Sequence, residues 1–412
     1  MTGAYLPRVL YLSGPIEPPW TRSDKNLVRD VAIGLTRYQG RVLTHEGVVG
    51  ALPAHVETEP AWGPRVAGDT PIGRRFGLFG RLLHASDVQL VHLFWPADPL
   101  VAQVVGLGAR ARGLPVIHTL VRAPRNTLGI TRMIAGEPVV ALTRTTTRRV
   151  QGDGVVDALY IPHGVPLSPL GVLAAEQRAA LSLRLRARYG IPPDVPLVLY
   201  AGDYRHRYAA RTVAAVLPRV VRELDCHFVL ACRLLDDSDR QEEARIREAV
   251  GADGLSRHVS FLNVIEDLRE LMAVSDVQIF PADSVDERMD MPRVLLEGMA
   301  EGLATVVTNK SPFEELVEPG AAIGVPSMQP VAIANAVVEL LRDDARRTAL
   351  GEAGRKLIET RYSVRSVIAS YEALYDRVLD GSDAASASAG RSALRRTGER
   401  IVALSRRSGA ST

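Results

Sequence analysis

The stretch 286–308 (DERMDMPRVLLEGMAEGLATVVT) contains the residue types best suited to holding a charged ligand. Glu297 lies on a predicted helix but off its apolar stripe, and Arg288 and Asp290 precede that helix in a loop. A carboxylate here can accept hydrogen bonds from ribose hydroxyls, while the helix N-terminus, with its free N–H groups and positive dipole end, attracts phosphate. The alternative is an ion pair between Glu297 and Arg293, one turn earlier, on a solvated helix face.

A second group of charged residues follows the predicted buried strand 195–201 (VPLVLYA). Gly202 opens the loop after this strand, and Arg205, Arg207 and Arg211 follow near the start of the next helix. A planar guanidinium binds phosphate oxygens through two parallel hydrogen bonds and stays charged at any relevant pH. Cations at a helix N-terminus oppose the local dipole, which favours an anionic partner over the alternative that they are only solvated. By position, Arg207 is the first candidate for this role and Arg205 the second.

Polar residues of the N-terminal half are candidates for the other side of such a site. A Gly/Pro-rich loop after the first apolar run contains Gly14 and Trp20, and His118 stands at the end of the predicted strand 115–119. Open α/β sheets bind ligands at the carboxyl ends of their strands. We therefore consider the Gly14–Trp20 loop and Arg122 candidate contacts for a ligand, with solvated surface positions as the alternative. For His118 the alternative is a structural, hydrogen-bonded role.

Strands and helices are predicted to alternate along most of the chain, which indicates parallel sheets with helices on both faces. With 412 residues, the chain is long enough for two α/β domains. The predicted divisions are an N-terminal domain at 1–165, a helical linker at 166–190, a C-terminal domain at 191–361, a final helix at 362–379 and a flexible basic tail at 380–412.

Composition excludes several classes of protein. A chain with 46% hydrophobic and 24% charged residues is globular, and a net charge of +3 is too small to indicate nucleic-acid binding. Without an apolar run of about 18 residues or a signal-peptide pattern, we expect a cytoplasmic protein. The absence of G-x-G-x-x-G disfavours a Rossmann dehydrogenase, and the spacing of Cys226 and Cys232 is not that of metal ligands.

Three segments resemble GT-B glycosyltransferases of the GT4-like, or glycosyl transferases group 1, family. In VLLEGMAEGLATVVT, Glu297 matches the second of two glutamates in the signature of that family. The first glutamate is replaced by Met289, within RMDMP, and Asp290 is the candidate to take over its role. The segments VVALTRTTTRRV and LYIPHGVP resemble those that close the N-terminal domain of the family. The resemblance covers 8–379 and is strongest over 276–318.

The resemblance implies a fold and a set of roles. The fold is two Rossmann-like, doubly wound domains facing a central cleft, with the nucleotide held mainly by the second domain and the helix 362–379 returning to the first. Glu297 would hold the ribose, Asp290 would orient the donor sugar, and His118 would line the reaction centre. The loop with Gly14 and Trp20 would lie on the acceptor side, and Arg122 would meet an anionic acceptor. Asp203 stands where the family usually has arginine. The implied contacts to the diphosphate and the rest of the donor are Arg207, Arg205, Gly202, Arg288, Met289, Asn309, Lys310 and Ser311.

The activity that the resemblance implies is that of a retaining glycosyltransferase, which moves a sugar from a nucleotide sugar, UDP-linked rather than GDP-linked, to a hydroxyl of a small molecule, lipid or glycan. No metal or other cofactor is expected, because arginines and a helix N-terminus can meet the leaving-group charge. The alternatives are a sugar-nucleotide epimerase of the same fold, or a catalytically impaired binding or activating protein, since Met289 and Asp203 depart from the family pattern. The basic tail is a candidate for weak contact with an anionic membrane surface, a disordered tail being the alternative.

Overall fold

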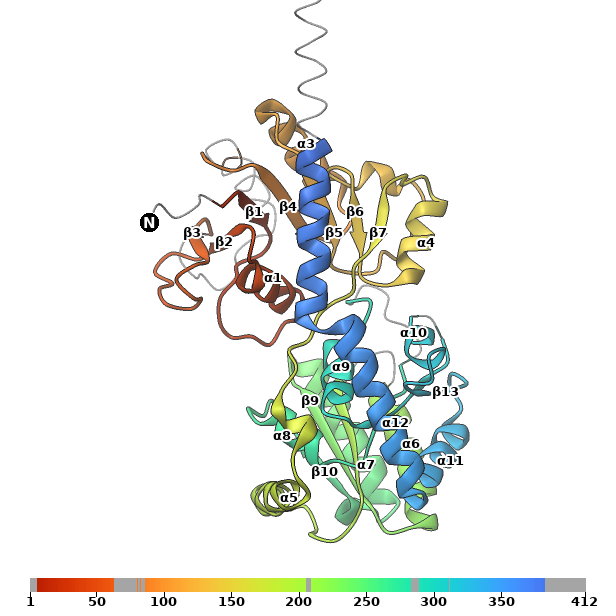
Figure 1. Ribbon diagram of the computed structural model, residues 1–412. Helices are drawn as coiled ribbons and strands as arrows, with labels where there is room; N and C mark the ends of the chain where they lie inside the picture. The colour runs from red at the N-terminus through yellow and green to blue at the C-terminus, as the bar shows by residue number, and fades with distance from the viewer. Residues whose placement is uncertain are drawn as a thin grey trace, which may run out of the picture.

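The computed structural model describes residues 6–62, 80, 82, 86–204, 209–282, 289–310 and 312–381. Within these residues the chain forms two parallel β-sheets with helices packed around them, one above the other in Figure 1. The predicted α/β fold with two Rossmann-like domains is therefore confirmed. The candidate residues Arg205, Arg207, Arg288 and Ser311 and the tail beyond 381 lie outside the described residues.

The first sheet has the strand order β3-β2-β1-β4-β5-β6-β7 among the described residues. Its strands are β1 Arg8–Leu12, β2 Gln39–Thr44, β3 Glu57–Pro60, β4 Leu90–Trp95, β5 Val116–Leu120, β6 Val139–Ala141 and β7 Ala158–Tyr160. The elements between them include α1 Ser23–Gly34, α3 Pro99–Arg112, η1 Ile130–Arg132 and α4 Arg144–Gly152. The strands β1, β4 and β5 are buried along almost their whole length, as expected for parallel strands that are covered on both faces.

The second sheet has the order β10-β9-β8-β11-β12-β13. Its strands are β8 Leu197–Asp203, β9 His227–Arg233, β10 Val259–Leu262, β11 Val277–Phe280, β12 Ala304–Thr308 and β13 Ile323–Val325. Around it lie α6 Ala209–Glu223, α7 Asp237–Ala252, η3 Ser256–His258, α8 Leu268–Val274, α9 Arg293–Ala300, α10 Glu314–Val317, α11 Pro330–Arg342, α12 Asp344–Leu357 and η4 Ile358–Tyr362. The strand order reverses beside β8, and in open parallel sheets such a reversal leaves a crevice at the carboxyl ends of the strands.

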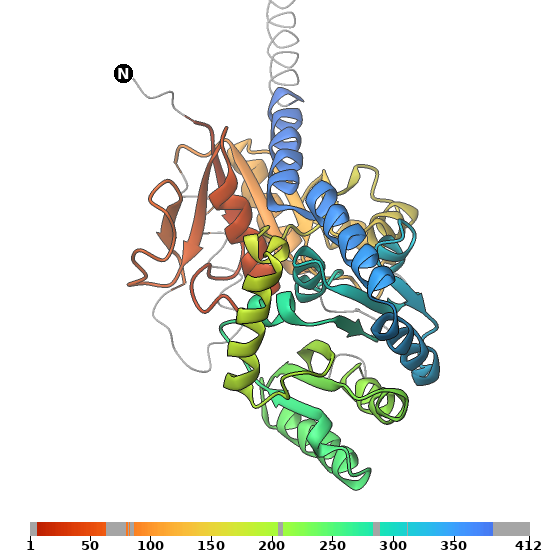
Figure 2. The ribbon, with the colours of Figure 1, turned by 60° about the horizontal axis from the view of Figure 1, so that its bottom comes forward.

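Two connections join the halves. The segment 166–190 contains η2 Pro169–Val172 and α5 Ala175–Tyr189, and α5 packs against α8 beside the second sheet. The chain crosses again at a bridge between Val165 and Ser363, and a last helix, 364–381, then runs along the first sheet (Figures 1 and 2). Its buried residues Val367, Tyr371 and Tyr375 belong to the same core cluster as β1 and α1. The N- and C-terminal ends of the described chain therefore pack in one half.

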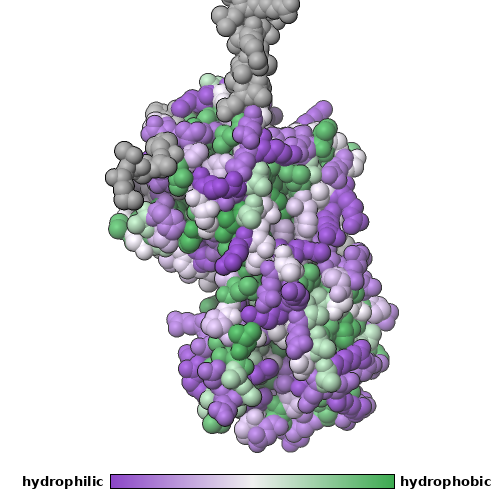
Figure 3. Space-filling view, viewed as in Figure 1, coloured by the Kyte–Doolittle hydropathy of each residue, from purple (hydrophilic) through white to green (hydrophobic). Residues whose placement is uncertain are grey.

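No helix among the described residues is long and apolar enough to cross a membrane. On the face seen in Figure 3, polar and apolar side chains are interspersed. Helix α1 begins at Ser23 and has Asp24 in its first turn, and the short strand β3 forms within a stretch rich in Pro and Gly.

Candidate active site

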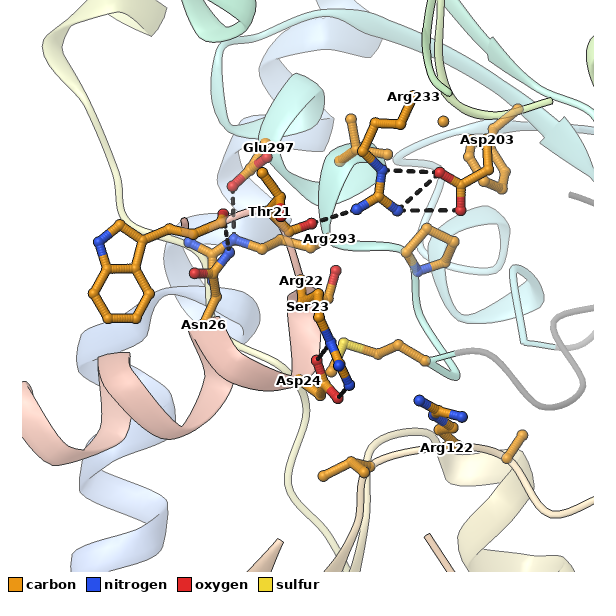
Figure 4. Close-up of a pocket in the computed structure, with 18 of the residues that line it drawn as sticks. Thr21, Arg22, Ser23, Asp24, Asn26, Arg122, Asp203, Arg233, Arg293 and Glu297 are labelled. Atoms are coloured by element: carbon orange, nitrogen blue, oxygen red, sulfur yellow. Dashed lines mark hydrogen bonds and ion pairs between the residues drawn. The ribbon is translucent and has the colours of Figure 1, made fainter. Parts of the chain in front are cut away.

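A cleft of about 1020 Å³ lies between the two halves. Its N-terminal wall is made by residues 20–26 of the first loop and helix α1 and by the loop 121–126 after β5. Its C-terminal wall is made by the ends of β8 and β9, the segment 263–268 and the start of α9 (Figure 4). Strands of both sheets thus meet the cleft at their carboxyl ends, where parallel sheets bind ligands. No group of three or more His, Cys, Asp or Glu in the described part of the chain could hold a metal ion.

Glu297 lies in the C-terminal wall of this cleft, as predicted. Helix α9 is fixed by close packing on the sheet, since a Cβ atom at Gly298 would lie only 2.2 Å from Oε1 of Gln278. Gly302, with a φ of +79°, allows the turn that leads into β12. The side chain of Glu297 remains 17% exposed, and its Oε1 accepts a hydrogen bond of 2.7 Å from Nε of Arg293. The alternative ion pair therefore also forms, but in the wall of a cleft and not on a solvated helix face.

Arg293 connects this wall to the N-terminal half. Its side chain is only 6% exposed, and its Nη1 donates to Oδ2 of Asp30 on α1 at 2.7 Å. The same nitrogen lies 3.2 Å from Nε2 of His163, a buried residue of the segment before the crossing. Burial opposes the charge of Arg293, but the carboxylates of Glu297 and Asp30 outweigh it and raise the pKa of Arg293. One guanidinium thus holds carboxylates from both halves of the molecule.

Arg233 makes a second connection across the cleft, and it was not among the site residues predicted from the sequence. Its Nε and Nη2 donate to the two carboxylate oxygens of Asp203 at 2.9 and 3.1 Å, and its Nη1 donates to the carbonyl oxygen of Thr21 (Figure 4). The side chain of Arg233 is 32% exposed. The only signal in the sequence was its place directly after the apolar run 227–232. Asp203, where the resembled family usually has arginine, therefore fixes an arginine of the neighbouring strand.

The N-terminal wall contains Trp20 and Arg122, as the sequence analysis proposed. The guanidinium of Arg29 lies 4.8 Å from the centre of the Trp20 ring, a cation–π contact that orients the indole. Beside them Arg22 pairs with Asp24 at 2.5 Å, and this pairing outweighs burial and lowers the pKa of Asp24. Arg122 is exposed at the cleft (Figure 4).

Gly14 is not among the residues that line the cleft, and a Cβ atom there would meet nothing within 4 Å. The position therefore does not require glycine for a close approach. Gly202 and Met289, which were predicted to contact the donor, do line the cleft. Asn309 and Lys310 are exposed at the end of β12 and lie outside its lining, and the backbone N–H of Asn309 bonds to Val325.

His118 is not among the residues that line the cleft. Its side chain is buried, its Nε2 lies 3.1 Å from the carbonyl oxygen of Trp95, and its Nδ1 accepts from the N–H of Ala135 at 3.3 Å. Burial lowers the pKa of His118 to about 4, so the ring is neutral at physiological pH. Because both ring nitrogens are bound to the backbone, the geometry agrees with the structural alternative and not with a catalytic role.

Asp290 does not line the cleft either. Its carboxylate is buried and accepts from the hydroxyl of Thr143 at 3.1 Å, and Thr143 caps helix α4 of the N-terminal half. Burial raises the pKa of Asp290 to about 6. The nearby Glu315 accepts from the backbone N–H of Arg144 at 2.6 Å, in the first turn of the same helix. The expectation that Asp290 orients a donor sugar is therefore not supported, because this carboxylate joins the two halves instead.

Comparison with known proteins agrees with this architecture. Residues 195–343 match the Glycosyl transferases group 1 family. The chain is 28% identical to phosphatidyl-myo-inositol mannosyltransferase of Mycobacterium leprae, over 54% of each chain, so it spans about half the length of that relative. It is 26% identical to the GDP-mannose-dependent alpha-(1-6)-phosphatidylinositol monomannoside mannosyltransferase of Mycobacterium tuberculosis, over 68% of this chain and 74% of that one.

Among solved structures, a glycosyltransferase of Rickettsia africae superposes with a TM-score of 0.72 at 14% identity, over 91% of this chain and 99% of that one. At this identity the similarity shows the fold alone. The family match, over residues 195–343, includes Gly202, Arg233 and Glu297 in the wall of the cleft. Residues 195–343 thus match the Glycosyl transferases group 1 family, within a chain that has the GT-B fold of two Rossmann-like domains.

Proposed function

We propose that this protein is a retaining glycosyltransferase, which binds a nucleoside diphosphate sugar in the cleft and transfers the sugar to an acceptor hydroxyl. The observation that carries the proposal is the position of Glu297. It lies on helix α9, within the residues that match the group 1 family, in the wall of a cleft of about 1020 Å³, with one carboxylate oxygen bound to Arg293. For Oε2 the described residues provide no hydrogen-bond donor, so this oxygen is available to ribose hydroxyls.

The charge of the cleft supports a diphosphate ligand. The described lining contains the arginines at 22, 122, 125, 233 and 293 and the carboxylates at 24, 203 and 297, so five cations face three anions and the net charge is +2. Arg233 is oriented by Asp203 and remains partly exposed, which suits a group that binds phosphate oxygens. In this proposal Arg233 stabilises the departing diphosphate, together with the first N–H groups of α9, and no metal ion is required.

The pairing of the carboxylates in the cleft bears on how the anomeric configuration of the sugar would be retained. Each carboxylate that lines the described part of the cleft, on Asp24, Asp203 and Glu297, is paired with an arginine. A paired carboxylate with its charge compensated is a poor nucleophile toward the sugar. We therefore propose that a phosphate oxygen of the leaving group, and not a side chain, helps to deprotonate the acceptor on the face from which the nucleotide departs.

The proposed donor is a GDP- or UDP-linked hexose. The sequence resemblance favours UDP, whereas the Mycobacterium tuberculosis relative is named as GDP-mannose-dependent, which makes GDP-mannose the first donor to test. For the acceptor, the N-terminal wall offers Trp20 and the exposed Arg122. An aromatic ring and an arginine together suit a polyol that carries an anionic group, and the two relatives are named for phosphatidylinositol-based substrates.

The test is a turnover assay on the purified protein. GDP-mannose and UDP-glucose are each incubated with and without phosphatidylinositol in mixed micelles, and release of the nucleoside diphosphate and the anomeric configuration of the product are measured, with and without EDTA. We expect release that depends on the acceptor, retention of configuration and no effect of EDTA. Isomerisation of the donor without acceptor would favour the epimerase alternative, and nucleotide binding without any release would favour the binding protein.

A further inference from the structure

The N-terminal wall of the cleft depends on the loop 121–129, between β5 and η1. Arg122, Arg125 and Asn126 of this loop line the cleft. A hydrogen bond of 2.9 Å from the N–H of Leu128 to Oδ1 of Asn126 shapes the turn within the loop, but it does not attach the loop to the rest of the N-terminal half. The position of the loop in the wall therefore depends on contacts with other elements.

Helix α4 holds this loop at two points. Arg149 lies in the last turn of α4, and its Nη2 donates to the carbonyl oxygens of Pro124 and Arg125, at 3.2 Å in each case. Asp153, directly after the helix, accepts a hydrogen bond from the hydroxyl of Thr127. Because Pro124 and Arg125 line the cleft, Arg149 binds the backbone of the wall itself.

The opposite end of α4 contacts the C-terminal half. The hydroxyl of Thr143, which caps the helix, donates to Asp290. The N–H of Arg144, in the first turn, donates to Glu315. Carboxylates are favoured at a helix N-terminus, where they meet free N–H groups and the positive end of the dipole. A helix of nine residues thus connects a contact with the C-terminal half to the loop of the N-terminal wall.

We propose that Arg149 is a positioning residue for the acceptor: together with Asp153, it fixes the loop to α4 and so sets where Arg122 stands across the cleft from the donor. This inference rests on the proposed function, in which Arg122 meets an anionic group of the acceptor. Arg149 is not part of the cleft lining, so it acts through the loop and not through contact with a ligand. Its loss affects the acceptor and not the nucleotide, because Glu297 and Arg233 lie in the other wall.

The experiment separates acceptor binding from donor binding in Arg149→Met. Steady-state kinetics use phosphatidylinositol in mixed micelles and whichever of GDP-mannose and UDP-glucose the wild type turns over, and binding of the nucleoside diphosphate is measured by calorimetry. We expect KM for phosphatidylinositol to rise about tenfold, because two hydrogen bonds from a charged donor no longer hold the loop. The Kd of the nucleotide should stay within about twofold of the wild-type value. Arg149→Lys, which can reach one of the two carbonyl oxygens, should restore part of the loss.

Two further variants make the comparison specific. Arg148→Met removes the exposed neighbouring arginine of the same helix, which does not line the cleft, and should leave every constant unchanged. Thr127→Val removes the hydroxyl that binds Asp153 without altering α4, and should raise KM for phosphatidylinositol about threefold. If Arg149→Met does not fold, Thr127→Val provides the test. Hydrogen exchange of the loop amides should be at least about fivefold faster in Arg149→Met and unchanged in Arg148→Met.

The possible outcomes separate this inference from the function on which it rests. A higher KM for the acceptor in Arg149→Met and Thr127→Val, with unchanged nucleotide binding, supports the inference. Faster exchange of the loop with an unchanged KM overturns it, because the loop would then be held for stability alone. An equal loss of nucleotide binding also overturns it. If the wild type shows no release that depends on the acceptor, the proposed function fails, and the role of Arg149 toward the acceptor fails with it.

Discussion

Replacement of Arg233 by methionine tests whether the cleft stabilises a departing diphosphate. Methionine keeps most of the length and apolar stem of the side chain and removes the charge. The structure shows two roles that the substitution would abolish together: the paired hydrogen bonds to Asp203 and the positive charge at the cleft. A second variant, Asp203→Asn, separates these two roles, because it weakens the ion pair but leaves the guanidinium of Arg233 in place.

The expected magnitudes differ between these roles. Hydrogen bonds to charged groups contribute about 1.5–3 kcal/mol each, but Arg233 is about one-third exposed, so we expect either variant to lower the free energy of unfolding by only about 1–2 kcal/mol. A preorganised charge at the site where negative charge develops contributes more to the rate. Loss of one such group typically lowers kcat by about 10²–10³.

The assay is a comparison of kcat, KM and denaturant unfolding for the wild type, Arg233→Met and Asp203→Asn. We expect Arg233→Met to lower kcat by about a hundredfold. In Asp203→Asn, kcat should fall by less than about tenfold despite a similar loss of stability. Equal losses of kcat in the two variants would mean that Arg233 matters only as the structural partner of Asp203 and does not stabilise the diphosphate.

Two further predictions concern Asp290 and His118, which are buried and outside the lining of the cleft. Because burial raises the pKa of Asp290 from 3.8 to about 6, folding favours its protonated form; the stability this provides is complete below pH 4 and is lost as the pH rises through 6, by about 3 kcal/mol. In Asp290→Asn the unfolding free energy should decline less between pH 4 and 7, and an unchanged slope would contradict this assignment. His118→Ala should lower the unfolding free energy by about 2–4 kcal/mol and leave kcat of the folded protein within about threefold. A hundredfold loss of kcat in stable protein would restore His118 to the reaction centre.

Local patterns in the sequence predicted the elements and the position of Glu297 well. The apolar spacing of 295–303 and the glycine at 302 define α9 and its end, and a residue off that apolar stripe must face outward from the core. The predicted strand ends likewise lie near the cleft, because parallel strands bring their carboxyl ends to one edge.

The orientation of individual side chains at those edges could not be predicted in the same way. Arg233 acts with Asp203, 30 positions away, and with Thr21, 212 positions away, and no local pattern indicates such partners. His118 stands at a strand end as expected, but its ring turns inward to the backbone of Trp95 and Ala135. Asp290 likewise has a distant partner that no local pattern indicates, since Thr143 caps a helix of the other half.

A calorimetric titration of Glu297→Gln shows whether Glu297 holds the nucleotide in the cleft. GDP-mannose and UDP-glucose are titrated into this variant, the wild type and the surface control Glu339→Gln, whose carboxylate pairs with Arg346 away from the cleft. We expect Glu297→Gln to bind the preferred donor about tenfold to a hundredfold more weakly, and Glu339→Gln to bind like the wild type. The same dissociation constant in all three proteins would mean that Glu297 does not hold the nucleotide.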